Sequence, residues 1–492
     1  MRIFSLLRFI IFLQFYGCNF LLRKIPLIGV IFWPLEIFSL PRIRATKGER
    51  LRNFLTALGP TYIKLGQVLS TRPDLVGVKI AAELTYLQDR LPAFSEKKLR
   101  KILVTEYPEG YQHYFKDFNF KAIAAASISQ VHQAALLDGT MVAVKVLRPN
   151  IWSCFQKDLK FLYFIAALIN ILPIAKRLKP KAVIKVFEET VIKELDLRIE
   201  AAAAGKLAEN LADNDQVIIP EIYWSHTTKN IMVSRWVEGI KINKKAELEK
   251  SKLDLAKLGN NLVLCYYDQA YRDGYFHADM HPGNIMITKE GKIALLDFGI
   301  MGELPYHDRL YVAQIVYGFI KRDYDYVARI HLEAGYIPED ANLADFALSC
   351  RSIGEPIFGK AAKDIYISKM LTQLFQITEK FGMETQPQLL LLQKTLLMIE
   401  GVGKELNPEL NMWSLGEPWM KAWSRKNLNP RQEAKRQLQD ALAIAKTVPQ
   451  LIYKAERFFD NFEQRKAKRQ KQHLLYFTLG AVLSAVTFVL IS

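Results

Sequence analysis

The sequence predicts an α+β protein of two lobes, with a helical extension before them and further helices after them. Three stretches support this fold class. "MVAVKVL", residues 141–147, is short, rich in β-branched residues and preceded by the turn "LDGT", which is typical of strands. Residues 181–210 have the composition and the apolar spacing of a long helix. Residues 303–460 are mostly helical by the same criteria and contain no motif of recognisable chemistry.

Length and charge limit the class of protein. A chain of 492 residues is too long for one compact core and is expected to form two or three packed units. Half of the residues are apolar and 24% are charged, as in globular rather than disordered chains. The net charge of +17 favours an anionic partner, such as a phospholipid surface, a nucleic acid or a nucleotide. Charge alone does not choose among these three.

The cysteines indicate a reducing compartment. Cys18, Cys154, Cys265 and Cys350 are far apart and show neither Cys-x-x-Cys nor metal-finger spacing. We therefore expect buried free thiols.

Residues 474–492 predict a transmembrane helix. This run, "LLYFTLGAVLSAVTFVLIS", has no charge in 19 residues. At about 1.5 Å per residue, it just crosses a hydrocarbon core of roughly 30 Å. Because a basic cluster between Arg465 and Lys471 precedes it, the positive-inside rule keeps the preceding chain in the cytoplasm. A buried C-terminal helix is the alternative interpretation.

Residues 1–44 predict an interfacial, membrane-associated segment. They are apolar but are interrupted by charges such as Arg8 and Arg23 and by Pro26 and Pro34, so neither half offers a clean span. The basic side chains can reach lipid headgroups while the apolar ones enter the acyl boundary. A signal peptide is the competing interpretation, but no small-residue cleavage site follows the apolar stretch.

Helical and strand-like stretches alternate between these ends. Residues 45–117 predict a helical extension with breaks at Gly59-Pro60 and Arg72-Pro73. Residues 120–147 predict strands, as do "VIIPEIYW" and "NIMVSRWV" further along. Helices are expected over residues 255–272, and "KIALLDFGI" predicts another strand.

The segment "FHADMHPGNIMI" concentrates polar side chains around a helix break. Because Pro282-Gly283 prevents a helix from continuing through His277 and His281, these histidines need not share a face. A zinc site of the His-x-x-x-His kind requires such a helix and a third ligand. The sequence therefore disfavours zinc.

Four side chains match the requirements of phosphoryl transfer. Asp279 and Asn284 are five apart, and Asp297 follows the strand "KIALL" in the tripeptide Asp-Phe-Gly. A carboxylate such as Asp279 can position and deprotonate an attacking hydroxyl, while an amide and a second carboxylate hold Mg²⁺. Upstream, "VAVK" places Lys145 on a strand. The order and spacing match the catalytic signature of protein kinases.

The glycine-rich loop of those kinases is missing. Its place before Lys145 is taken by "IAAASISQVH". Glycines let backbone amides close over phosphates, and an alanine-rich turn restricts that approach, so we expect the nucleotide to lie differently. The residues predicted to contact nucleotide here are Ile123, Ala124, Ala125, Ala126, Ser127, Ile128, Ser129, Gln130 and Val131.

Together these motifs resemble the UbiB/ADCK atypical kinase family, most closely its bacterial UbiB branch of ubiquinone biosynthesis. The resemblance rests on "IKLGQVLSTRPDL", "AAASISQVH", "VAVKVLRP", "KELDLRIEA", "HADMHPGN" and "LLDFG", in this order. It covers residues 45–300 and is specific, because the Lys-x-Gly-Gln and alanine-rich motifs are not those of ordinary kinases. It implies an atypical protein-kinase-like two-lobe fold, membrane-anchored, with an N-lobe over residues 118–240 and a helical C-lobe and C-terminal helices over 241–460.

The resemblance also implies roles for individual residues. ATP and Mg²⁺ are the expected cofactors, with Asn284 and Asp297 as magnesium ligands and Asp279 as the catalytic carboxylate. Lys145 is expected to orient the phosphates and to pair with Glu200. The segment "RWVEG" is expected to be a hinge that contacts adenine through its backbone, and its nucleotide-binding residues are Trp236 and Glu238.

Four more residues are expected to be regulatory. Lys64 and Gln67 are three apart and so share one helical face, while Glu194 and Asp196 offer anionic partners. In the family this N-terminal motif is thought to fold over the cleft and to shield it from polypeptides. No Ala-Pro-Glu closes an activation segment after Gly299, which also argues against a protein substrate.

The implied function is that of a membrane-bound atypical kinase or ATPase supporting ubiquinone biosynthesis at the cytoplasmic side of the bacterial inner membrane. The expected partners are ATP, anionic membrane lipids, prenylated phenol or quinone precursors and other ubiquinone biosynthesis proteins, without nucleic acid. Two alternatives stay open. "HADMHPGN" also resembles the catalytic loop of aminoglycoside and choline kinases, which suggests a small-molecule phosphotransferase. A nucleotide-sensing scaffold without turnover is the other.

One departure from the family concerns the anchor. Bacterial UbiB proteins typically end in two adjacent transmembrane segments, whereas this chain has room for one after Gln472.

Overall fold

The computed structural model describes residues 2–21, 45–70, 76–84, 86–87, 92–169, 180–358, 367–382 and 386–427. Residues Met1–Glu417 belong to one compact unit, and of the second unit, Pro418–Ser492, only the end of one helix is described. No helix in these described ranges is long and apolar enough to span a bilayer. The predicted transmembrane helix at 474–492 lies outside them, as do residues 22–44 of the predicted interfacial segment.

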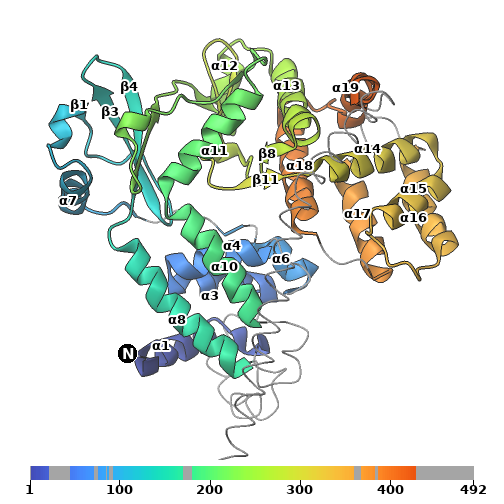
Figure 1. Ribbon diagram of the computed structural model, residues 1–492, viewed down its shortest axis with the longest axis horizontal. Coiled ribbons are helices and arrows are strands. Elements are labelled where there is room, and N and C mark those ends of the chain that lie inside the picture. The colour runs from blue at the N-terminus through green and yellow to red at the C-terminus, as the bar shows by residue number, and fades with distance from the viewer. Residues whose placement is uncertain are drawn as a thin grey trace, which may run out of the picture. The chain divides into compact units, whose positions relative to one another are not determined.

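The N-terminal helices lie close together (Figure 1), and buried side chains from them share one apolar cluster. They are α1 (Arg2–Phe15), α3 (Lys47–Leu58), α4 (Pro60–Ser70) and α6 (Val78–Leu84), with the 3₁₀ turn η1 (Cys18–Leu21). The predicted break at Gly59-Pro60 is confirmed. Gly59 ends α3 with a φ of 112°, which favours glycine, and Pro60 begins α4, where its missing N–H would have no partner. The predicted break at Arg72-Pro73 lies outside the described residues.

A five-stranded antiparallel sheet forms the first lobe, in the order β1-β3-β4-β6 with β2 paired to β3. The strands are β1 (Phe115–Phe118), β2 (Ala124–Ala125), β3 (Ser129–Leu136), β4 (Met141–Leu147) and β6 (Ile231–Arg235). The strands predicted over residues 120–147 are therefore confirmed. Val142, Val144 and Val146 are fully buried in a cluster with α7 (Glu96–Glu106), and strand alternation turns Lys145 to the opposite face.

Residues 181–210 form two helices, and the prediction of one long helix was wrong. α10 (Pro180–Glu194) ends just before Asp196, which caps α11 (Leu197–Asn210) by accepting a hydrogen bond from the Arg198 N–H. Both leucines at the break, Leu195 and Leu197, are buried. The Leu197 N–H donates to the Lys229 carbonyl, which ties the start of α11 to the turn before β6. The composition favoured helix throughout, but capping and tertiary contacts prevailed here.

The second lobe is mostly helical with short strands. One sheet has the order β5-β10-β9-β7, and β11 pairs with β8. The strands are β5 (Val217–Ile218), β7 (Ile240–Lys241), β8 (Tyr275–His277), β9 (Ile285–Ile287), β10 (Ile293–Leu295) and β11 (Met301–Glu303). "VIIPEIYW" contributes the two-residue strand β5, which pairs parallel to β10. Further along the same segment, Ile222 forms an isolated antiparallel bridge to Ser234 of β6 in the first lobe.

The helices of this lobe begin with α12 (Lys245–Lys250) and α13 (Leu255–Tyr267), which continues as the π-helical turn η5 (Asp268–Asp273). Helical structure dominates the described residues after 303, as predicted. These helices are α14 (Tyr306–Lys321), α15 (Tyr324–Glu333), α16 (Leu343–Phe358), α17 (Ile367–Lys380), α18 (Pro387–Leu406) and α19 (Met412–Asn427). α18 packs against α13 and contacts β11, so the C-terminal helices reach the central part of the lobe.

The four cysteines carry free thiols. Cys18, Cys265 and Cys350 are buried as expected, and burial raises the pKa of each thiol to about 12. Cys154 departs from the expectation, because it lies exposed on α8 (Ile151–Ile169).

Replacing the capping residue Asp196 tests what the cap contributes at the break between α10 and α11. Asp196→Ala removes the acceptor for the Arg198 N–H, and we expect it to lower the free energy of unfolding by about 1 kcal/mol. Asp196→Asn keeps a capping oxygen and is the control, with a smaller loss. Urea unfolding followed by circular dichroism measures both, and an Ala variant as stable as the Asn variant would contradict the cap.

Candidate active site

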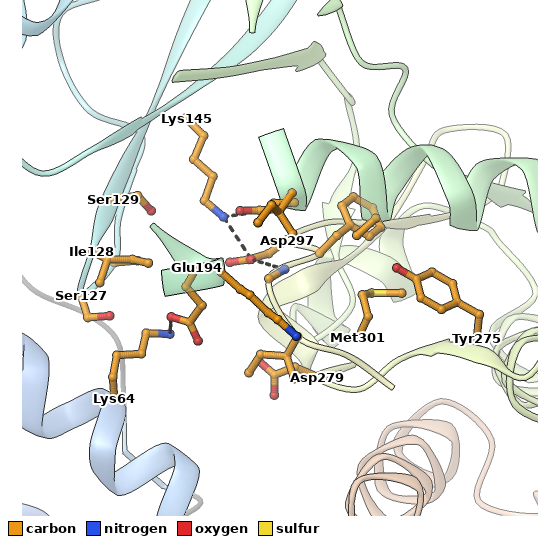
Figure 2. A pocket seen from close by; sticks show the side chains of 18 residues that line it. Lys64, Ser127, Ile128, Ser129, Lys145, Glu194, Tyr275, Asp279, Asp297 and Met301 are labelled. Carbon is orange, nitrogen blue, oxygen red and sulfur yellow. Dashed lines mark hydrogen bonds and ion pairs between the residues drawn. The ribbon is translucent and has the colours of Figure 1, made fainter. Parts of the chain in front are cut away.

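A cavity of about 230 Å³ lies among α4, the turn after β2, β4, α10, α11 and the loops after β8 and β10 (Figure 2). Ten of the twenty predicted site residues meet here, although they come from segments far apart in the chain. Those that line the cavity are Lys64, Ala126, Ser127, Ile128, Ser129, Lys145, Glu194, Glu200, Asp279 and Asp297.

Lys145 stands between two carboxylates. Its Nζ is 2.6 Å from Glu200 Oε1 on α11 and 3.1 Å from Asp297 Oδ1 on the loop after β10. The expected pairing of Lys145 with Glu200 is therefore present. The side chains of Lys145 and Glu200 are 12% and 8% exposed, whereas that of Asp297 is 46% exposed and faces the cavity (Figure 2).

The two carboxylates that share the Lys145 ammonium have pKa values shifted in opposite directions. Burial raises the pKa of Glu200, as does the neighbouring charge of Asp297, and they outweigh the opposing effect of Lys145. Desolvation also acts on Asp297, but there the Lys145 ammonium prevails and holds the pKa below its usual range. Asp297 thus stays ionised where a metal or phosphate group would approach, and Glu200 is the first of the two to take up a proton on acidification.

His277 connects the loops that carry Asp279 and Asp297. It is fully buried, its Nδ1 accepts a hydrogen bond from the Asp279 N–H (3.1 Å), and its Nε2 lies 3.0 Å from the Leu296 carbonyl. Because Nδ1 is an acceptor, Nε2 carries the proton and donates to Leu296. Burial lowers the pKa of His277, so the neutral ring that this pattern requires is favoured.

His281 and Asn284 make hydrogen bonds that hold the loop after β8. His281 Nδ1 accepts from the Gly283 N–H and caps the 3₁₀ turn η6 (Pro282–Asn284). The Asn284 amide donates through Nδ2 to the Asp279 carbonyl (3.1 Å), while its backbone carbonyl accepts from the Leu296 N–H. This orientation gives the Asn284 Oδ1 the acceptor role that a metal ligand needs. Both histidines of "HADMHPGN" therefore position backbone rather than share a face.

Asp297 adopts a left-handed backbone conformation, with a φ of 59°. Aspartate tolerates this region better than most residues, and the turn lets Oδ1 accept from the Gly299 N–H at 3.4 Å. Phe298 is buried with its ring 5.7 Å from that of His277. The Asp-Phe-Gly tripeptide is thus held by the same histidine that holds Asp279.

The alanine-rich segment forms a turn rather than a continuous strand. Ala124–Ala125 make the short strand β2, and the Ala126 N–H donates to the Ser129 carbonyl. The Arg148 guanidinium donates to the Ala126 carbonyl at 2.7 and 3.1 Å and to the Pro92 carbonyl at 2.9 Å. Ser127 Oγ is buried without a hydrogen-bond partner in the described part of the chain.

Only the middle of this segment reaches the cavity. The residues of this segment that do not line it are Ile123, Ala124, Ala125, Gln130 and Val131. The Gln130 side chain is buried and engaged, since its Oε1 accepts from the Phe94 N–H and its Nε2 donates to His132. That these five residues contact nucleotide stays a prediction.

The predicted hinge residues also lie outside the cavity. The Trp236 N–H donates to the Met141 carbonyl, so β4 already uses this donor. The Glu238 carboxylate pairs with Lys289 at 3.2 Å, and both side chains are mostly exposed. That this segment contacts adenine through its backbone stays a prediction.

Lys64 lies within the cavity and pairs with Glu194 at 3.0 Å, with both side chains 10% exposed (Figure 2). This pair connects α4 of the extension to the end of α10. Asp196 does not share it, because its carboxylate caps α11 and pairs with Arg198 at 2.7 Å. Gln67 does not line the cavity, and its buried Oε1 has no hydrogen-bond partner among the residues described.

Sequence reasoning missed Arg148 and Lys394. Arg148 stands in the quoted motif "VAVKVLRP", and a charged residue directly after a buried strand was a usable signal. Lys394 of α18 lies 3.4 Å from Asp279 Oδ1. It carried no signal, because 115 residues separate the two in the sequence.

The donor set fits a magnesium ion. Carboxylate and amide oxygens are its usual protein ligands, and Mg²⁺ commonly takes only one or two protein ligands beside substrate phosphates. Asp297 and Asn284 supply these two types on adjoining loops. Within the described ranges, no group of three or more His, Cys, Asp or Glu side chains could hold a metal ion.

Comparison with known proteins identifies two matching domains. Residues 86–331 match the ABC1 atypical kinase-like domain, and residues 350–411 match the UbiB helical domain. A Marinobacter nauticus protein named "Probable protein kinase UbiB" is 38% identical over 437 residues, which cover 86% of this chain and 80% of the relative. A Cellvibrio japonicus protein of the same name is 35% identical over 463 residues, covering 92% and 83%.

Among solved structures, that of Rv3197 with erythromycin from Mycobacterium tuberculosis is 23% identical with a TM-score of 0.46, covering 70% of this chain and 91% of that one.

The role of His277 predicts that its contribution to the stability of the protein depends on pH. Its pKa is lowered in the folded protein, so the stability that it contributes is present above the ordinary value of 6.5 and is lost as the pH falls through the folded value. His277→Leu leaves the Asp279 N–H without its acceptor, and we expect a loss of about 1–3 kcal/mol at pH 7.5.

The measurement is urea unfolding of wild type and His277→Leu between pH 7.5 and 5. The stability difference between the two proteins is expected to shrink as the pH falls. A difference that stays constant or grows would refute the assignment of a neutral His277.

Proposed function

The chain belongs to the UbiB family of ABC1 atypical kinase-like proteins, and we propose that it is a membrane-bound ATPase or kinase supporting ubiquinone biosynthesis. The observation that carries the proposal is the convergence of Lys145, Glu200, Asp297 and Asp279 on one cavity. The quinone pathway rests on the resemblance to bacterial UbiB proteins. The phosphate acceptor is a lipid-like precursor or water.

Each side chain has a distinct part in this chemistry. Lys145, held by Glu200, binds and orients the nucleotide phosphates. Asp297 and Asn284 hold Mg²⁺, which when bound neutralises charge on the phosphate oxygens. Asp279 positions the attacking hydroxyl or water and accepts its proton. Ser127, buried on the turn after β2, offers a hydroxyl to the nucleotide from the other side of the cavity.

Two features favour an acceptor other than a protein. β11 follows Gly299 almost directly and α14 begins at Tyr306, which leaves little chain for a peptide-docking activation segment. The Lys64–Glu194 pair also forms part of the cavity wall, and its lysine comes from the N-terminal extension. We propose that this pair regulates access to the site.

The alternatives differ in turnover. A small-molecule phosphotransferase shares the catalytic loop, but the alanine-rich turn and the Lys64 motif are not typical of such kinases. A nucleotide-sensing scaffold would retain the residues that bind Mg-ATP without needing Asp279 as a base. Loss of activity on replacement of Asp279 therefore distinguishes a catalyst from a sensor.

The test is steady-state phosphate release from Mg-ATP by the full chain in anionic liposomes, with and without an apolar phenol. We expect turnover that the membrane or the phenol stimulates, and Asp279→Asn to lower it about 100-fold or more while nucleotide still binds. Asp340→Asn, at an exposed position, is the matched control. Nucleotide binding without hydrolysis in wild type under all conditions would favour the scaffold.

We also propose that α1 contacts anionic lipid. One face of α1 packs into the protein through residues such as Phe9, which meets Phe54 of α3 edge-on at 5.2 Å. The other face exposes Leu7, Ile11 and Phe15, which are 56%, 55% and 46% accessible and follow helical spacing. An apolar stripe of this kind suits the acyl boundary, and the net charge of +17 suits anionic headgroups.

Site-specific labelling tests this contact in the full chain. In a Cys154→Ser background, Ile11→Cys labelled with a polarity-sensitive fluorophore is expected to shift to the blue in anionic vesicles and to be quenched by brominated lipid, because the side chain enters the acyl region. Leu348→Cys, at an exposed position on α16, is the control and is expected to stay unquenched. Equal behaviour of the two probes would rule out α1 as the contact.

A further inference from the structure

Lys394 brings a positive charge to the catalytic loop from the UbiB helical domain. Its Nζ lies 3.4 Å from Asp279 Oδ1, and the two side chains are 24% and 26% exposed. Lys394 belongs to α18, within residues 350–411 and outside the kinase-like domain at 86–331. It does not line the cavity, so it reaches Asp279 from outside the set of side chains that surround the nucleotide site.

The backbone around Lys394 is firmly placed. The buried Tyr266 hydroxyl of α13 donates to the Leu392 carbonyl at 2.8 Å, and this bond joins α18 to the helix that leads into β8. Thr395 and Leu396, the next residues along, are 0% and 1% exposed. Lys394 therefore projects from a packed segment, and a lysine so placed loses less freedom on pairing than one on a mobile surface.

The catalytic loop itself offers Asp279 a weaker partner. His281 Nε2 is 3.9 Å from Asp279 Oδ2, and the other ring nitrogen of His281 caps the turn at Gly283. The backbone of Asp279 is fixed by His277 and Asn284, but those bonds leave the carboxylate free to rotate. Of these two contacts to the Asp279 carboxylate, that of Lys394 is the shorter.

We propose that Lys394 is a positioning residue for Asp279, contributed by the helical domain. It holds Oδ1 so that the other carboxylate oxygen faces the attacking hydroxyl or water. Lys394 thus makes phosphoryl transfer depend on the docking of α18 against α13. This inference rests on the proposed function, in which Asp279 is the proton acceptor.

Steady-state kinetics of the full chain in anionic liposomes test the proposal. Lys394→Met is expected to lower kcat about tenfold or more with little change in the KM for ATP, because Lys394 acts on Asp279 and not on the nucleotide. Lys394→Arg keeps the charge and is expected to retain most of the activity. Lys380→Met, at an exposed position in the last turn of α17, is the matched control and is expected to behave as wild type.

A double variant separates positioning from a general structural effect. In the Asp279→Asn background, Lys394→Met is expected to change kcat no further, since the group through which it acts is already lost. A second drop of about tenfold in that background, or a loss in Lys394→Arg equal to that in Lys394→Met, overturns the proposal. So does unchanged kcat in Lys394→Met.

Binding of Mg-ADP with and without aluminium fluoride, measured by calorimetry, provides a readout that needs no turnover. Aluminium fluoride occupies the place of the transferred phosphoryl group, and a correctly held Asp279 orients the attacking water toward it. We expect wild type to bind Mg-ADP more tightly with aluminium fluoride, and Lys394→Met to lose most of that gain while binding Mg-ADP alone normally.

The two assays also separate this inference from the proposed function. If wild type hydrolyses no ATP but its aluminium fluoride gain depends on Lys394, the ATPase proposal fails and the positioning role stands. If wild type hydrolyses ATP and the gain is the same in Lys394→Met, the positioning role fails alone. If wild type shows neither ATP hydrolysis nor tighter binding of Mg-ADP with aluminium fluoride, both proposals are overturned.

Discussion

The ion-pair cluster of Lys145, Glu200 and Asp297 is the interaction on which the site depends. It joins β4, α11 and the loop after β10, three segments that are far apart in the sequence. Burying one ammonium with two carboxylates is unfavourable unless the surrounding structure holds their geometry, because the cost of desolvation offsets much of the attraction. Here the apolar face of β4 and the capped start of α11 supply that support, so the cluster is a consequence of the packing around it.

The second lobe is organised in the same way around one neutral side chain. Gln269 of the π-helical turn accepts from the His277 N–H, and the His277 ring then binds the backbone on both the Asp279 and the Asp297 loops. A charged ring could not accept from Asp279, so burial and function require the same protonation state. Asp279 is therefore held by its backbone on one side, and its carboxylate contacts Lys394 of the helical domain on the other.

Two buried lysine–glutamate pairs lie on either side of the break between α10 and α11. Glu194 at the end of α10 pairs with Lys64 from the extension, while Glu200 in the first turn of α11 pairs with Lys145 from the sheet. A continuous helix would fix the relative direction of these two carboxylates at its own 100° per residue. The cap at Asp196 frees them from that constraint, and each carboxylate faces a different lysine on the wall of one cavity.

The sequence by itself determined which local elements carry the candidate site residues. The strand alternation around Lys145, the break at Pro282-Gly283 and the Asp-Phe-Gly turn are local properties, and local patterns record them. Tertiary structure alone decided the rest. The helix break depended on Leu195 and Leu197 finding buried positions, and the burial of Gln130 depended on the Phe94 N–H. Lys394 met Asp279 only because α18 packs on α13, since contacts between distant segments follow from packing and leave no periodic trace in the chain.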